Sequence, residues 1–206
     1  MKFLLVSHSQ KIGGAEKCLI ELAEAFIKKG YKVVVVLPQK AENYQLFKDI
    51  GCAIIIKPYP WWVSNLLVDV SFFEKIRQHL SLLKSFFTFL SIIASVKPNC
   101  ILTNTICIPQ AALISKLFNL KHFWFIHELG LEDHKLKYNY GIKFSTKLMS
   151  LCSSKVFVNS EFVFDYYSKY ISENKLEVVE LNIPVENIKF REPVHKIELV
   201  IIGQIQ

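Results

Sequence analysis

The stretch KFLLVSHSQKIGGAEKCLIELAEAFIKKGYKVVVVLP, residues 2–38, decides the fold. It opens on a short apolar run and closes on four consecutive valines, and both runs are typical of strands buried in a parallel sheet. Between them, apolar residues recur at helical spacing from Cys18 to Phe26, and Gly30 stands where a helix commonly ends. Charged residues from Glu16 to Lys28 occupy the opposite side of this helix. The stretch therefore predicts a strand–helix–strand unit.

Two adjacent glycines, Gly13 and Gly14, stand where the first strand turns into the helix, in a chain with only seven glycines. One explanation is architectural, because glycine makes tight turns easy. The other is chemical, because bare backbone N–H groups at a helix N-terminus form a seat for an anion. The turn by itself leaves both explanations open.

The same alternation continues along the chain. The remaining strands are expected at 52–57, 99–104, 121–127, 155–160 and 176–182. The remaining helices are expected at 42–49, 72–96, 107–118 and from residue 161. A loop containing proline and tryptophan and a charged segment at 132–147 connect some of these elements. Seven strands that alternate with helices predict an α/β fold with a doubly wound, mostly parallel, Rossmann-like sheet.

The C-terminal end predicts a second domain. We expect a first domain at 1–182 and a linker at 183–196, which is polar and contains two prolines. Residues 197–206, IELVIIGQIQ, have the composition of a buried strand followed by a turn. We interpret them as the first strand of a C-terminal domain that the sequence lacks.

Composition narrows the function classes. The net charge is +7, but only Arg77 and Arg191 of the 25 basic residues are arginines, which is weak support for nucleic-acid binding. Diffuse lysines suit an anionic membrane surface or a phosphate-bearing ligand, or they are simply solvated. The five cysteines are far apart and form no CxxC pair, which favours a reducing compartment and speaks against a zinc site. We expect neither a signal peptide nor a membrane-spanning run.

Polar residues follow several of the expected strands. His127 and Glu128 end the strand at 121–127, Asn104 and Thr105 follow the strand at 99–104, and Asn159 and Ser160 end the strand at 155–160. The carboxyl ends of parallel strands share one edge of the sheet with the glycine turn, where ligands bind in such folds. His127 either caps its strand or bonds a ligand hydroxyl and moves protons. Ser160 is either a helix N-cap or a ligand contact.

Other nucleotide-binding motifs are missing. IGGAEK does not match GxGxxG, no acidic residue ends the second strand, and no GxxxxGK[ST] segment occurs. These absences weaken, without removing, the alternative of a nucleotide-dependent oxidoreductase. A non-catalytic binding module on the same fold is a further alternative.

Taken together, the residues resemble the N-terminal domain of a GT-B glycosyltransferase of the family 4 type. The matching segments are GGAEKCLIELAEAFIKKGYKVVVV, the pair His127–Glu128, VFVNSEFV at 156–163 and the closing LVIIGQI. The resemblance implies a retaining transfer of a sugar from a nucleotide-sugar donor to a glycan or lipid-linked acceptor, with the acceptor held mainly by this domain. It also implies no metal and no cofactor besides the donor.

The same resemblance assigns roles to the matching residues. Gly13 and Gly14 are expected to offer backbone N–H groups to the donor diphosphate, and His127 is the expected catalytic residue beside the transferred sugar. Asn104, Glu128 and Ser160 are expected to bind substrate. The usual NG(V/I)D-like turn is reduced to LNIPVENI, and the donor-binding half is missing. The resemblance therefore predicts that this chain alone transfers no sugar.

Two segments are candidates for contact with a membrane. The expected helix at 72–96 carries Lys75, Arg77 and Lys84 among phenylalanines, so it is either an interfacial helix or a helix that covers the sheet, and we favour the latter. HKLKYNYGIKFSTKLMS, residues 134–150, interleaves lysines with aromatic residues and is the better surface candidate. We expect a cytoplasmic protein that can work at the inner face of the membrane, without a nucleic-acid partner.

Overall fold

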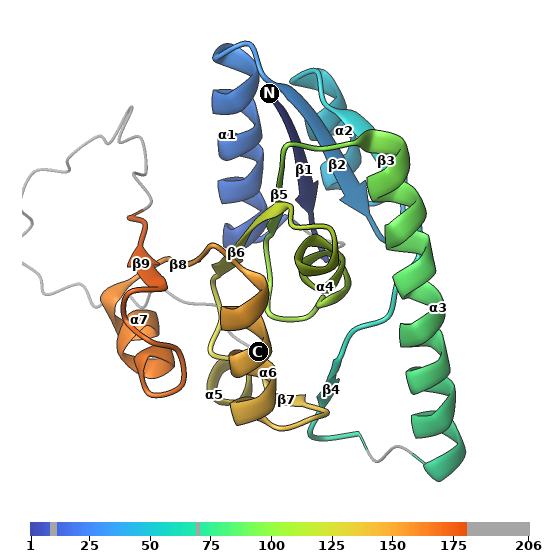
Figure 1. Ribbon diagram of the computed structural model, residues 1–206, viewed down its shortest axis with the longest axis vertical. Helices are drawn as coiled ribbons and strands as arrows, with labels where there is room; N and C mark the ends of the chain where they lie inside the picture. Colours follow the sequence, from blue (N-terminus) through green and yellow to red (C-terminus); the bar gives the residue numbers. More distant parts are fainter. Residues whose placement is uncertain (9–11, 69–70, 181–206) are drawn as a thin grey trace, which may run out of the picture.

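The computed structural model describes residues 1–8, 12–68 and 71–180 (Figure 1). The strands of the described part are β1 (Lys2–Val6), β2 (Lys32–Leu37), β3 (Ala53–Ile56), β4 (Val63–Asn65), β5 (Cys100–Thr103), β6 (Lys121–Ile126), β7 (Leu136–Tyr138), β8 (Lys155–Val158) and β9 (Leu176–Val178). The helices are α1 (Gly14–Lys28), α2 (Asn43–Asp49), α3 (Phe72–Val96), α4 (Gln110–Leu117), α5 (Leu131–His134), α6 (Ile142–Cys152) and α7 (Glu161–Ser168). The expected linker at 183–196 and strand at 197–206 lie outside the described residues.

The strands form a seven-stranded sheet in the order β3-β2-β1-β5-β6-β8-β9. Every neighbouring pair is parallel, with Val6 opposite Val36 on one side and Thr103 on the other. The order reverses between β1 and β5, so the chain winds outward in both directions from the centre. This confirms the predicted doubly wound, Rossmann-like sheet, and it places the topological switch point directly after β1.

The two faces of the sheet carry separate hydrophobic cores. Leu5, Val35 and Leu37 point to the face covered by α1 and α2, where Leu19 and Phe47 are fully buried. The strand residues that point to the other face of the sheet pack against α3, α4, α6 and α7 in a larger core that includes Trp124. Strands buried on both faces explain the unbroken apolar runs in the sequence.

Helix α3 divides into a buried and an exposed half. Ser71 and Glu74 form a reciprocal capping box at its start, and Phe89, Ile92 and Ile93 near its end are buried against the sheet. The favoured prediction of a sheet-covering helix therefore holds for the C-terminal half, whereas apolar residues of the N-terminal half stand in solvent. By length and composition, one helix of the described part, Phe73–Val96, qualifies as a possible membrane span, so the expectation that no segment reaches that size is wrong.

The sequence did not reveal four of the described elements, namely β4, β7, α5 and α6. Strands β4 and β7 form a two-stranded antiparallel sheet, with Val63 opposite Tyr138. Three residues are too few for a periodic signal, and their position depends on Trp62, which stacks on Trp124 at 6.2 Å between ring centroids. Helix α6 begins inside the segment 132–147, which the sequence predicts as a charged connection. Its apolar residues Phe144 and Leu151 are exposed, so they do not form the continuous buried stripe by which a helix is recognised.

Glu16 corrects another expectation. It belongs to the charged side of the first helix by sequence, yet its side chain is buried and accepts hydrogen bonds from Ser7 Oγ at 2.6 Å and Asn43 Nδ2 at 2.7 Å. The first turn of α1 lies against the end of β1, so a side chain that a helical wheel places in solvent is enclosed by neighbouring segments. Burial raises the pKa of Glu16, although the two hydrogen bonds oppose this shift.

Candidate functional site

A cleft of about 510 Å³ lies at the carboxyl ends of the central strands. Its walls come from the ends of β1, β6 and β8, the start of α1, the segment before β4 and the start of β7 with the residues before it. The lining residues are His8, Gly13, Gly14, Ala15, Glu16, Trp61, His127, Glu128, His134, Leu136 and Asn159. The glycine turn and His127 thus share one edge of the sheet, as the strand pattern predicts.

The fold itself does not need glycine at the turn into α1. Gly13 is the N-cap residue with φ −99° and accepts the first helical hydrogen bond, from Lys17 N, at 3.0 Å. Among the described residues, a Cβ atom added to Gly13 or Gly14 meets no atom within 4 Å beyond its chain neighbours and the backbone of its own helix. Neither positive φ nor crowding therefore explains the pair, and what the missing side chains provide is open access from the cleft to the backbone at the positive end of the helix.

His127 is held in one tautomer by its neighbour on β5. Asn104 Nδ2 donates to the carbonyl of Ala15 at 3.0 Å, so Asn104 Oδ1 faces His127 Nε2, 2.8 Å away. An amide oxygen only accepts, so Nε2 carries the proton and Nδ1 keeps the lone pair. Burial lowers the pKa of His127 from 6.5 to about 4, although Glu128 opposes the shift. At neutral pH the ring is therefore uncharged.

Asn104 lies beneath the cleft and is not among its lining residues. Its side chain is completely buried, and both ends of the amide are used, one on α1 and one on β6. The structure gives it the role of positioning His127. A direct contact of Asn104 with substrate stays a prediction.

Glu128 lines the cleft and also organises the loop that follows β5. Oε1 accepts from Thr105 Oγ1 at 2.8 Å and from the backbone N–H of Ile106 at 2.9 Å, and Oε2 accepts from the N–H of His127 at 3.0 Å. This buried carboxylate therefore joins the loops after β5 and β6. Its predicted contact with substrate is compatible with its place in the cleft wall.

The end of β8 contributes Asn159 to the cleft, and Ser160 lies outside the lining. Ser160 has extended backbone and its Oγ accepts from Val163 N at 3.4 Å, so it is the N-cap of α7. The geometry supports the role of Ser160 as a helix N-cap. Its role in binding substrate stays a prediction. Asn159 Nδ2 donates to the carbonyl of His127 at 3.3 Å.

Sequence reasoning missed three polar lining residues, His8, Glu16 and His134. His8 follows the end of β1 as His127 follows β6, so the same rule would have found it. Its ring meets the edge of Trp61 at 5.5 Å between centroids. Burial lowers the pKa of His8, although Glu128 opposes this shift. His134 belongs to the segment expected to be a charged connection, and only the tertiary structure brings it to the cleft.

The chain matches the family model described as Glycosyltransferase Family 4 over residues 12–186. Among solved structures it resembles HepE from Anabaena in complex with UDP and glucose, at 16% identity and a TM-score of 0.61, with 89% of this chain and 45% of that one covered. A glycosyltransferase from Rickettsia africae ESF-5 is 17% identical with a TM-score of 0.61, with coverages of 87% and 42%. MurG from Acinetobacter baumannii is 11% identical with a TM-score of 0.56, with coverages of 86% and 45%.

A comparison with curated protein sequences gives no significant match. The chain spans less than half the length of each of the three solved proteins. At these identities the structural likeness shows the fold, and the family model, which covers most of the chain, shows the family. The chain belongs to Glycosyltransferase Family 4.

Proposed function

We propose that this chain is the acceptor-side, N-terminal half of a retaining glycosyltransferase, which moves a sugar from a nucleotide-sugar donor to a glycan or glycolipid acceptor in polysaccharide or glycolipid assembly. The observation that carries the proposal is the common cleft of the open Gly13–Gly14 turn and the neutral imidazole of His127. One offers donors to an anion, and the other offers a lone pair to a hydroxyl group.

The glycine turn is the seat for the donor diphosphate. Helix α1 is 15 residues long and begins at the cleft edge, where the N–H groups of its first turn have no partner within the helix and the absent side chains leave room for close approach. Negative charge that develops on a leaving diphosphate is stabilised by such oriented dipoles. The solved complexes of HepE with UDP and with UDP-glucose support a nucleotide-sugar donor for this fold.

His127 acts on the transferred sugar as a hydrogen-bond acceptor. Its Nε2–H is engaged by Asn104, so Nδ1 is the atom that accepts from a sugar hydroxyl group. With a pKa of about 4 the ring cannot serve as a proton donor near pH 7. The neutral state also avoids adding a buried positive charge to the cleft, so the diphosphate is attracted by backbone dipoles and not by this side chain.

The acceptor side includes a membrane surface. Ile76, Leu80, Leu83 and Phe87 recur every three or four residues along the first two thirds of α3 and expose 43%, 54%, 60% and 63% of their surfaces. We call these four residues the α3 stripe. Lys75, Arg77 and Lys84 are exposed on the same part of the helix. A basic helix with an exposed apolar stripe supports peripheral binding to anionic lipids at the inner, cytoplasmic face of a membrane.

A second copy of this chain fits the α3 stripe less well. In a helix pair built on the stripe, Arg77 and Lys84 would flank the seam, because they lie one residue and about two turns beyond Ile76. Two such helices would bring like charges together along the seam, whereas anionic lipid headgroups complement them. The charge pattern therefore favours a lipid surface.

A nitrogen-15 NMR titration with UDP tests the proposed function. We expect the amide signals of Gly13, Gly14 and Ala15 and the ring signals of His127 to shift together, and UDP-glucose to shift the same set. Equal or larger shifts with NADH would support the oxidoreductase alternative, and no shift in these signals with either ligand would support a non-catalytic module.

Turnover is the second arm of this test. Incubation of the chain alone with UDP-sugars and membrane lipid extracts is expected to transfer no label to lipid or glycan. Transfer by this chain would contradict its assignment as half of an enzyme, even if UDP binds at the glycine turn.

A further inference from the structure

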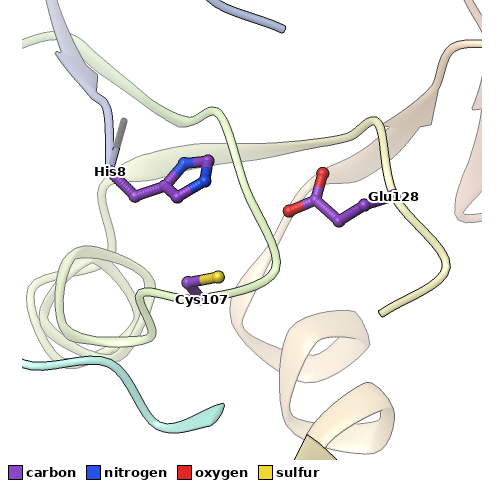
Figure 2. A group of neighbouring side chains, drawn as sticks. All are labelled: His8, Cys107 and Glu128. Atoms are coloured by element: carbon purple, nitrogen blue, oxygen red, sulfur yellow. The ribbon is translucent and has the colours of Figure 1, made fainter. Parts of the chain in front are cut away.

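Three potential metal ligands from distant parts of the sequence meet beside the cleft. His8 follows β1, Cys107 lies in the loop between β5 and α4, and Glu128 follows β6. Figure 2 shows the three side chains directed into the same space from three sides. One ligand atom of each residue, an imidazole nitrogen, the thiol sulfur and a carboxylate oxygen, lies within 4.8 Å of the other two.

The imidazole of His8 has an unused, buried ligand atom. Its Nδ1 is inaccessible to solvent and has no hydrogen-bond partner among the described residues. The ring orientation is supported by the edge contact with Trp61 at 5.5 Å. A buried nitrogen without a partner is unfavourable in a native protein and needs an explanation, such as a bound ion.

The other two ligands are also held in place. The loop that carries Cys107 is fixed by the bond from its own N–H to Thr105 Oγ1 at 3.1 Å, and the side chain is completely buried. Glu128 Oε1 accepts two hydrogen bonds, whereas Oε2 accepts one, so Oε2 retains a lone pair. Thr105 therefore supports both Cys107 and Glu128, as an outer-shell residue does around a metal.

We propose that an imidazole nitrogen of His8, the thiol sulfur of Cys107 and a carboxylate oxygen of Glu128 bind a zinc ion, with a fourth coordination position open to the cleft. Nitrogen, thiolate and carboxylate ligands together suit Zn²⁺ better than Mg²⁺ or Ca²⁺, which prefer oxygen alone. Ligand atoms around tetrahedral zinc lie about 3.5 Å apart, so the three side chains need to close by roughly one ångström. Binding releases the Cys107 thiol proton to solvent, and the resulting thiolate coordinates the metal.

The open position follows from the exposure of the ligands. His8 and Glu128 line the cleft and Cys107 does not, so the ion would be bound from the protein side and accessible from the cleft side. A water molecule or an anionic oxygen can complete the tetrahedron. The site does not depend on sugar transfer, and its test is a binding measurement on the chain as it stands.

Cobalt(II) substitutes for zinc and reports a thiolate ligand by its charge-transfer absorption in the near ultraviolet. We expect one equivalent of Co²⁺ to produce this absorption in the chain, and Zn²⁺ to displace it. Cys107→Ser should abolish the absorption, and His8→Gln should weaken binding. Cys100→Ser is the matched control, because Cys100 is also a buried thiol, on β5, and is outside the cluster.

Loss of the band in Cys107→Ser, with its retention in Cys100→Ser, supports the site. A wild-type chain that gives no band, or a Cys107→Ser variant that keeps it, overturns the proposal. X-ray absorption of the zinc-loaded wild-type chain covers the case in which a variant fails to fold. One sulfur neighbour at about 2.3 Å with nitrogen and oxygen neighbours at about 2.0 Å is expected, and a shell without sulfur excludes the site.

Discussion

Nε2 of His127 lies 2.8 Å from Oδ1 of Asn104, and this contact joins the carboxyl ends of β6 and β5 beneath the cleft. The amide of Asn104 cannot flip, because Nδ2 is committed to the carbonyl of Ala15 at the start of α1. One buried side chain thus connects the glycine turn to the imidazole and decides which ring nitrogen remains available to a ligand. The two residues are 23 positions apart in the sequence and follow different strands.

Asn104→Leu should release the ring of His127 while preserving the volume of the side chain. Two buried hydrogen bonds are lost, so the free energy of unfolding should fall by about 2–3 kcal/mol. Nitrogen-15 spectra of the imidazole should change from pure Nε2–H to a mixture of tautomers. Asn159→Leu is the control, because Asn159 bonds the backbone carbonyl of His127 and not its ring. An unchanged tautomer in Asn104→Leu would contradict the positioning role.

Gly13→Ala and Gly14→Ala separate the two explanations of the glycine pair. Because a Cβ atom at either position meets open space, the free energy of unfolding should change by less than about 1 kcal/mol. Affinity for UDP should fall about tenfold, a loss of about 1.4 kcal/mol, because the added methyl group occupies the approach to the backbone. Calorimetric titration measures both affinities.

Gly51→Ala is a control in which stability should fall while the affinity for UDP stays unchanged. Gly51 has φ +93°, where a side chain is strained, so this variant should lose about 1 kcal/mol of stability or more and bind UDP normally. Large destabilisation of the Gly13 or Gly14 variants with normal UDP affinity would favour the architectural explanation.

His122 should make the domain sensitive to acid. Its ring is fully buried between Thr103 Oγ1 and Ser153 Oγ, each 2.9 Å away, and burial lowers its pKa from 6.5 to about 3. Between these pKa values the unfolded chain binds a proton that the folded chain excludes, so stability is complete above pH 6.5 and falls as the pH is lowered.

This protonation difference amounts to about 2 kcal/mol for one histidine between pH 7 and pH 5. Urea unfolding at both pH values should therefore show a loss that is about 2 kcal/mol smaller in His122→Asn than in wild type. The variant is expected to be less stable at pH 7, because its polar contacts are imperfect. An equal pH dependence in both proteins would mean that the pKa of His122 is the same in the folded and unfolded chains.

The α3 stripe should carry membrane binding. Wild-type chain is expected to float with vesicles that contain anionic lipid, less at high salt, and not with neutral vesicles. Leu80→Glu combined with Leu83→Glu should abolish flotation, because both side chains are exposed and would bring negative charge to the lipid surface.

Leu117→Glu and Leu151→Glu are matched controls for the stripe. These leucines, on α4 and α6, expose 67% and 59% of their surfaces and lie outside the stripe. Flotation of the stripe variant at the wild-type level would refute the assigned surface, and loss of flotation in a control variant would shift the assignment to the helix that carries the substituted leucine.

The elements that the sequence predicted share a physical cause. β1, β2 and β6 are apolar runs buried on both faces, and α1 has an apolar face and a glycine at its end, so each carries its own local signal. β4 and β7 carry none, because three-residue strands persist only through the packing of Trp62 and its neighbours. The same limit applies to α6, whose exposed apolar residues blur its periodicity.

Within the cleft, sequence reasoning located the glycine turn, Gly13 and Gly14, and two residues that follow a strand, His127 and Glu128. It could not assign their states. The burial of Glu16 depends on side chains from three segments, and the tautomer of His127 depends on a bond between Asn104 and Ala15, 89 positions apart.

The sequence by itself determined the order of strands and helices, the parallel sheet and the edge on which polar residues gather, because hydrophobic period and chain direction are local properties. Only the tertiary structure decided which atoms meet there. His8, Cys107 and Glu128 belong to three separate connections and form no spacing motif, yet their ligand atoms lie within 4.8 Å of one another. Contacts of this kind are products of strand order and loop packing, so no short segment of the chain encodes them alone.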